Sequence, residues 1–159
     1  MAGLTHFDDN GKANMIDVHE KQETVRKARA KGSIYVTREI FDAVRSGTAE
    51  KGDVLGIARV AGIMATKKSP ELIPLCHPIA LTKSGVEFTL YEDELRIEAE
   101  CTASCVGRTG IEMEVLTGVT VALLTIYDMC KGLSQKMRIS DVRLVEKEGG
   151  KSGHYIAEE

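Results

Sequence analysis

The feature that most constrains the fold is a long apolar stretch between two glycines, Gly110 and Gly132. Its apolar residues recur at helical spacing, and the main set comprises Val115, Val119, Ala122, Ile126 and Met129. Several β-branched residues favour a strand, but a stretch of about 20 residues is too long for an ordinary strand. The sequence therefore predicts a helix between the two glycines, with Gly132 as its left-handed C-cap.

The opposite side of this predicted helix is also largely apolar, because it carries Thr117, Val121 and Leu124. A helix that is apolar on nearly all sides must be covered on both faces. The chain of 159 residues is long enough for one domain with its own core, but short for two layers over one helix. We therefore expect another subunit to cover the second face.

Charged residues at both ends of the predicted helix are candidates for chemistry. Glu112 and Glu114 near its start and Lys131 at its end suit the helix dipole, whereas Asp128 in the last turn opposes it. Asp128 could simply pair with Lys131 three positions on, an interaction worth roughly 0.2–0.5 kcal/mol. Position alone leaves a structural role and a catalytic role for Asp128 both open.

The remaining periodicity predicts an α+β domain. The expected order is a strand (33–37), two helices (38–45 and 53–64), two strands (86–90 and 95–103), the long helix and a last strand (137–145). This is the β-α-β-β-α-β order of a ferredoxin-like fold, in which helices pack on one face of an antiparallel sheet. Thr37 and Asp53 are the expected N-caps, and a change of phase at Ser140–Asp141 predicts a bulge.

Composition divides the chain and limits its partners. Residues 1–32 are polar and predict a partly mobile N-terminal arm, 33–148 form the ferredoxin-like catalytic domain, and the Gly-rich residues 149–159 form a flexible tail. A net charge of −3 and an aromatic share of 4% disfavour nucleic acid as a partner. We expect no membrane partner either, and cysteines within apolar segments suggest reduced thiols in a cytoplasmic protein.

A loop stiffened by proline holds the best-placed histidine. Pro74 and Pro78 restrict the backbone around Leu75, Cys76 and His77. A lone histidine is more often structural than catalytic, although a rigid loop is a good platform for catalysis. Both roles stay open for His77.

Lysines flank the second predicted helix at both ends. Lys51 precedes its N-terminus, where unpaired backbone N–H groups favour phosphate, but on sequence alone the position favours a solvated loop lysine over a phosphate contact. Lys67 at the other end is a candidate second anion contact. Zinc is a weaker alternative: Cys101 and Cys105 would point into the core from one strand, so Cys76 and His77 would lack a paired knuckle, and we predict no metal site.

The length of the predicted helix determines whether its two charged ends can contribute to one site. Glu112 and Asp128 lie 16 positions apart, which separates them by roughly 24 Å along a helix. One small-molecule pocket cannot use both ends of one copy. Two antiparallel copies about a two-fold axis would bring Glu112 and Glu114 of one chain towards Asp128 and Lys131 of the other. The sequence therefore predicts a composite site between subunits.

Three segments, Pro74–Pro78, Gly110–Glu114 and Ile126–Lys131, resemble the signature segments of the MoaC family of cyclic pyranopterin monophosphate synthases, which act in molybdenum cofactor biosynthesis. The resemblance extends over nearly the whole chain, including Met15–Val18 and Gly149–Gly153. Several segments in the same order make the match specific.

The resemblance implies a lyase that converts 3′,8-cyclo-7,8-dihydroguanosine 5′-triphosphate to cyclic pyranopterin monophosphate and releases pyrophosphate. It implies a homohexamer built as a trimer of dimers, with sites at the dimer interface and general acid–base chemistry. No cofactor is firmly implied, and whether Mg²⁺ accompanies the triphosphate stays open.

By position, the resemblance implies a catalytic set of Asp128, Lys131, Lys51, His77 and Glu112, with Lys51 as a general acid. The implied substrate-binding set is Leu75, Cys76, His77, Met113 and Glu114, and we expect Arg26 and Lys67 as phosphate contacts. Two other classes stay open from the residues alone. A nucleotide-sensing module would need the basic residues but not Asp128, and a zinc hydrolase would need a bound metal.

Overall fold

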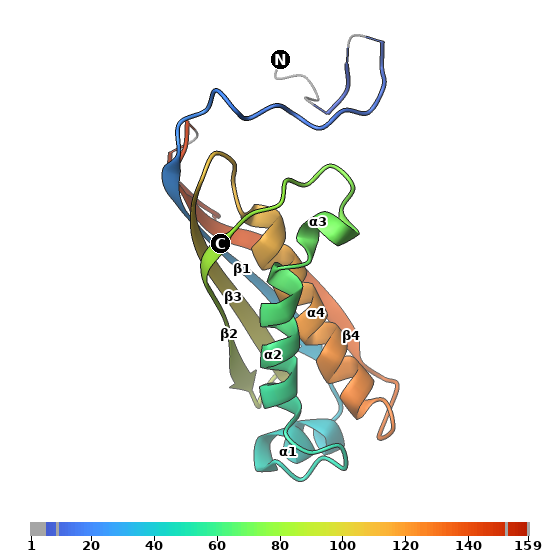
Figure 1. Cartoon of the computed structure of the whole chain (residues 1–159). Helices are drawn as coiled ribbons and strands as arrows, with labels where there is room; N and C mark the ends of the chain where they lie inside the picture. Colours follow the sequence, from blue (N-terminus) through green and yellow to red (C-terminus); the bar gives the residue numbers. More distant parts are fainter. Residues whose placement is uncertain (1–5, 9, 152, 159) are drawn as a thin grey trace.

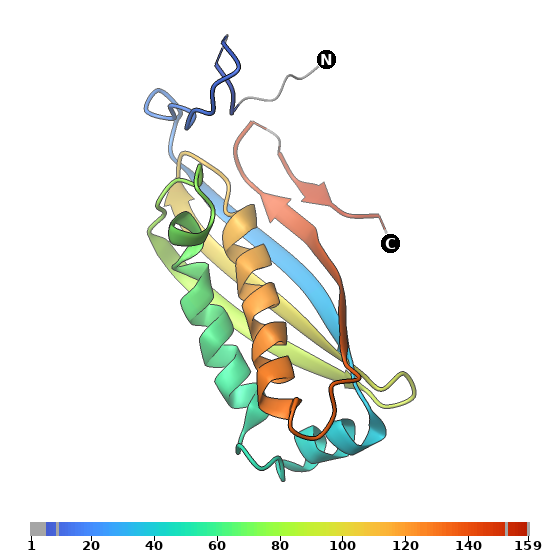
Figure 2. The ribbon, with the colours of Figure 1, turned by 90° about the vertical axis from the view of Figure 1, so that its right-hand side faces the viewer.

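A computed structural model describes residues 6–8, 10–151 and 153–158. The elements are β1 (Thr24–Tyr35), α1 (Arg38–Ser46), α2 (Val54–Thr66), α3 (Ser69–Leu72), β2 (Leu81–Tyr91), β3 (Arg96–Gly107), α4 (Glu112–Cys130), β4 (Arg138–Glu148) and β5 (Tyr155–Ile156). The sheet has the strand order β2-β3-β1-β4-β5, and every neighbouring pair is antiparallel. Helices α2 and α4 lie side by side across one face of it (Figures 1 and 2). The predicted α+β, ferredoxin-like arrangement is confirmed.

The two faces of the sheet differ because each strand alternates apolar and polar residues. On β3 every second residue is buried against the helices, from Ile97 to Cys105. The residues between them face away, and two of these, Glu98 and Glu100, form ion pairs with β1. Lys31 Nζ lies 2.9 Å from Glu98 Oε1, and Arg29 Nη1 lies 3.3 Å from Glu100 Oε2. One face is therefore apolar and covered, while the other carries a grid of charges.

Helix α4 occupies the centre of the helical layer. Val115, Val119, Ala122 and Ile126 are fully buried, as their spacing predicts. Among the described residues it is also the one helix long and apolar enough to cross a membrane by length and composition. Its packing against α2 and β1 accounts for that composition in this fold.

Two glycines let α2 and α4 approach closely. A Cβ atom built on Gly118 would lie 2.7 Å from Cys101 Sγ and 3.2 Å from the main-chain oxygen of Gly62. The first distance is shorter than real Cβ contacts and the second is tighter than most of them, so a side chain at Gly118 must push the helices or the sheet apart. The close pairing of α2 and α4 therefore depends on this glycine.

The predicted helix starts are confirmed, since Thr37 Oγ1 accepts a hydrogen bond from Ile40 N and Asp53 Oδ1 accepts one from Gly56 N. The predicted C-cap of α4 is wrong. Lys131 caps the helix in the right-handed region, and the chain continues into a turn closed by Leu133 N and Cys130 O at 2.9 Å. Gly132 therefore needs no positive φ there.

Strand boundaries near the termini differ from the prediction. β1 begins at Thr24 rather than at residue 33, so the last part of the predicted arm, with its basic residues Arg26, Lys27, Arg29 and Lys31, lies in a central strand. The charges of β1 are balanced by acidic residues on β3 and β4. These partners are distant in sequence, so local sequence patterns do not reveal them. The predicted flexible tail contains β5, which pairs with β4. Residues 1–5 and 9 of the predicted arm, and 152 and 159 of the predicted tail, lie outside the described residues.

Candidate active site

The predicted site residues fall into two groups at opposite ends of α4. The N-terminal group comprises Arg26, Leu75, Cys76, His77, Glu112, Met113 and Glu114. The C-terminal group comprises Lys51, Asp128 and Lys131. Lys67 follows α2 and is exposed, and no hydrogen bond or ion pair among the described residues joins its side chain to either group.

The C-terminal group is a small cluster of ionised side chains at the surface. Lys131 Nζ lies 2.7 Å from Asp128 Oδ1, which is the simple pair that the spacing allowed. Lys51 also reaches Asp128, with its Nζ 3.2 Å from the main-chain oxygen and 3.9 Å from Oδ2. The hydrogen bond from Lys131, its charge and that of Lys51 lower the pKa of Asp128. All three side chains are at least half exposed.

Two residues of the N-terminal group, Arg26 and Glu112, line a cavity of about 730 Å³ between β1, β4, the loop before α4 and the end of the N-terminal segment. Its basic lining residues are Lys21, Arg26, Lys27, Arg108, Lys147 and Lys151. Glu112 Oε1 lies 2.7 Å from Lys147 Nζ and so belongs to the wall. The N-cap residue of α4, Ile111, offers no side-chain oxygen to the first N–H groups of the helix. Clustered cations beside an uncapped helix start favour a multiply charged anion.

Glu114 follows the cavity-lining Glu112 by two residues on α4 and is only 2% exposed. Burial raises its pKa to about 7, and the neighbouring charge of Glu112 acts in the same direction. Burial and the Glu114 charge together raise the pKa of Cys76 and of Cys105, which places both thiols near this carboxyl. A carboxyl that titrates near neutral pH can give or take a proton at modest cost.

His77 contacts the N-terminal segment rather than a catalytic partner in its own chain. Its Nε2 atom lies 2.7 Å from the main-chain oxygen of Ile16. The same segment is held a few residues later, where Arg108 Nη1 donates to His19 O at 2.7 Å. The segment before β1 therefore passes over the proline loop and then along the cavity.

Lys147 and Arg108 line the cavity but were missed by the sequence reasoning. The reason for Lys147 is a second bulge, at which Leu144 and Glu146 of β4 pair with adjacent residues of β1 and leave Val145 over. This extra residue shifts the alternation and turns Lys147 to the helix side, opposite Ala28. The only local sequence signal for Lys147 is its position after an apolar strand and before a Gly-rich turn.

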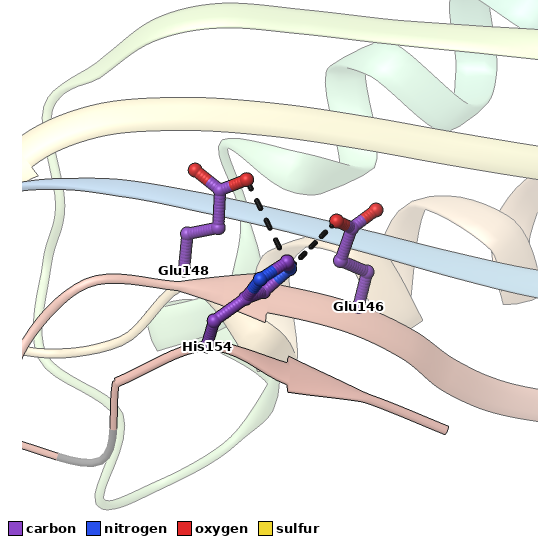
Figure 3. A group of neighbouring side chains, drawn as sticks. All are labelled: Glu146, Glu148 and His154. Atoms are coloured by element: carbon purple, nitrogen blue, oxygen red, sulfur yellow. Dashed lines mark hydrogen bonds and ion pairs between the residues drawn. The ribbon is translucent and has the colours of Figure 1, made fainter. Parts of the chain in front are cut away.

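A separate group of possible cation ligands lies on the open face of the sheet. Glu146, Glu148 and His154 converge there, with His154 Nε2 2.8 Å from Glu146 Oε1 and 3.9 Å from Glu148 Oε1 (Figure 3). Arg29 and Lys27 pair with the same carboxylates, at 3.0 and 3.4 Å. Because the chain's own cations already balance these charges, we interpret the group as part of the ion-pair grid.

Cys101 and Cys105 lie in the apolar core, as their positions on one strand predict. Burial raises the pKa of Cys101 to about 12 and also raises that of Cys105, so both are held as neutral thiols. These cysteines therefore act as small apolar residues of the core.

Comparison with known proteins decides the family. The sequence profile described as the MoaC family matches residues 15–150. This chain belongs to the MoaC family. The three signature segments and both residue groups lie within the matched range.

Two curated relatives match over the full length of both chains. One, from Heliobacterium modesticaldum, is 55% identical over 159 residues, and one from Novosphingobium aromaticivorans is 57% identical over 159 residues. Both are named cyclic pyranopterin monophosphate synthase. A solved structure of the ferredoxin protease FusC with Arabidopsis ferredoxin aligns with 70% of this chain and 10% of its own, at 15% identity and a TM-score of 0.34. That likeness is too weak to bear on the MoaC-family fold.

Proposed function

We propose that this MoaC-family enzyme is a cytoplasmic lyase that converts 3′,8-cyclo-7,8-dihydroguanosine 5′-triphosphate to cyclic pyranopterin monophosphate and pyrophosphate in molybdenum cofactor biosynthesis. The observation that carries the proposal is the identity of 55% and 57%, over whole chains, to relatives named for this product. The cation-lined cavity supports it, because a triphosphate requires several positive charges and N–H donors in one place.

We further propose that the working site combines the N-terminal group of one copy with the C-terminal group of a second. Helix α2 exposes Ile57, Val60 and Met64, and α4, which lies alongside it (Figure 2), exposes Leu124. Exposed apolar side chains on two neighbouring helices favour a protein partner. An isologous dimer with antiparallel α4 helices would bury this surface and complete two sites at once, and three such dimers would form the expected hexamer.

In this proposal the cavity at the start of α4 holds the phosphates. Arg26, Arg108 and Lys147 neutralise the triphosphate, and the start of α4 donates N–H groups. A substrate hydroxyl attacks the α-phosphorus, the bond from the α-phosphorus to the bridging oxygen breaks, and pyrophosphate leaves with its negative charge stabilised by these cations. The reaction needs no added redox partner.

The ring rearrangement requires several proton transfers between groups of different acidity. Asp128 is ionised and can accept a proton, whereas Lys51 and Lys131 can donate one to a leaving nitrogen or oxygen. Glu114 titrates near neutral pH and can act in either direction. The proposal assigns these roles to groups from two subunits, because no single copy brings both ends of α4 together.

The direct test is incubation of the purified chain with the cyclised triphosphate. We expect release of one pyrophosphate for each pterin fluorophore formed after oxidation, and no release from GTP under the same conditions. Tight binding of the substrate without pyrophosphate release would instead indicate a nucleotide-sensing module and contradict the proposal. Metal analysis of the same preparation tests the zinc hydrolase alternative.

A further inference from the structure

The contact between His77 and Ile16 indicates which nitrogen of the imidazole ring carries a hydrogen. A peptide oxygen only accepts hydrogen bonds, so the 2.7 Å contact requires a hydrogen on His77 Nε2. A neutral imidazole carries one N–H, so Nδ1 must then be the unprotonated nitrogen. Among the described residues, Nδ1 accepts no hydrogen bond.

Both partners of this contact are held independently. On one side, Pro74 and Pro78 stiffen the loop that carries the imidazole. On the other, Asp17 accepts hydrogen bonds from His19 N at 2.9 Å, and Arg108 donates to His19 O at 2.7 Å. The carbonyl of Ile16 is therefore fixed just before an anchored turn. A strong hydrogen bond between two fixed groups is suited to orienting a side chain.

We propose that the main-chain carbonyl of Ile16 is a positioning group that holds His77 as the Nε2–H tautomer and presents Nδ1 as a proton acceptor. The N-terminal segment thus completes the site as well as bordering its cavity. What Nδ1 does during turnover rests on the proposed function. The tautomer itself does not depend on it.

Nuclear magnetic resonance can observe the tautomer without any substrate. We expect long-range ¹H–¹⁵N spectra near pH 8 to show His77 with a protonated Nε2, an unprotonated Nδ1 and an Nε2–H proton protected from exchange. The resonances are assigned by their loss in His77→Gln. A variant that lacks residues 1–17 should lose the protected Nε2–H signal, whereas a control that lacks residues 1–12 keeps Ile16 and should retain it.

Two results would overturn the proposal. One is an Nδ1–H proton on His77 in the full chain, and the other is a protected Nε2–H signal that survives removal of residues 1–17. Kinetics separate this outcome from failure of the proposed function. His77→Gln retains an N–H donor for Ile16 but no base, so it should keep the amides of residues 14–19 protected from hydrogen exchange while turnover falls by about 100-fold. His77→Ala should lose both the amide protection and the turnover.

Discussion

The two ends of α4 carry the same contact in different surroundings. Lys147 and Glu112 at the start, and Lys131 and Asp128 at the end, both form ion pairs with a nitrogen–oxygen distance of 2.7 Å. The first pair is 28% and 27% exposed, and the second is 54% and 61% exposed. The first therefore builds the wall of a cavity, while the second is a water-facing pair whose members are free to meet another molecule.

The same contrast sets the acidity of the carboxyls. At the start of the helix, burial raises the pKa of Glu114 to about 7. At its end, the hydrogen bond and charge of Lys131 and the charge of Lys51 lower the pKa of Asp128. A site that used both ends would hold a proton-bearing acid and an ionised base at one pH, which is the separation that acid–base catalysis requires. One copy alone keeps them a helix length apart.

The largest expected effect comes from the exposed end. Asp128→Asn should lower kcat by about 10²–10⁴-fold, because it removes a base while leaving the shape of the cluster intact. The free energy of unfolding should change little, since the side chain is exposed. The matched control is Asp42→Asn on α1, where the carboxylate pairs with Arg45 at the same spacing and 3.0 Å. That variant should retain full activity in the pyrophosphate assay.

At the buried end, the expected effect is on stability as a function of pH. Glu114 has a pKa raised from 4.5 to about 7, so the folded state prefers its protonated form. The contribution of Glu114 to stability is therefore fully present below about pH 4.5 and is lost as the pH rises through 7, by roughly 3 kcal/mol. Asp128, whose pKa is lowered, acts in the opposite sense and loses its contribution as the pH falls.

Urea unfolding at intervals between pH 5 and pH 8 measures the contribution of Glu114. Glu114→Gln should flatten the profile and exceed the parent in stability at pH 8. Glu50→Gln, at an exposed glutamate, serves as the control and should follow the parent. A parent profile with no decline between pH 5 and pH 8 would show that the carboxyl is ionised without penalty.

Next in size is the helix packing that holds the two ends in place. Gly118→Val should reduce the free energy of unfolding by about 2 kcal/mol or more, because its side chain meets Cys101 Sγ and the Gly62 oxygen. Gly132→Ala, where no atom lies within 4 Å of the added carbon, should change it by less than about 0.5 kcal/mol. Equal losses in the two variants would mean that α2 and α4 are not in close contact.

The smallest effect compares the two ion pairs directly. A double-mutant cycle with Glu112→Gln and Lys147→Met should give a coupling of about 1 kcal/mol, because the pair is partly shielded from water. The equivalent cycle with Asp128→Asn and Lys131→Met should give about 0.3 kcal/mol. Couplings of equal size would mean that the pair in the cavity wall is no better shielded from water than the pair at the exposed end of α4.

The parts of the fold that follow from local chemistry were predictable from sequence. Alternation on β3, the helical spacing in α4 and the caps at Thr37 and Asp53 each depend on neighbours a few residues away. The start of β1 did not follow, because its lysines and arginines resemble a solvated arm until their partners Glu98 and Glu100 are brought alongside.

The site residues were likewise predictable only where the signal was local in sequence. The charged ends of α4 were visible as dipole-related residues, and the distance between them was calculable from the helix rise. Lys147 was not visible, because the bulge at Val145 reverses its face. The contact of His77 with Ile16 joins segments 61 positions apart and required the structure.

Mixing two variants, each expected to be inactive because it changes a residue of the implied catalytic set, tests most directly whether the site is composite. Glu112→Gln and Asp128→Asn place their defects at opposite ends of α4, so a mixed dimer would contain one site with both defects and one site with neither. After the two are unfolded and refolded together in equal amounts, we predict recovery of about a quarter of the parent activity, since half the dimers are mixed and each has one intact site. A refolded mixture as inactive as its two components would contradict the account.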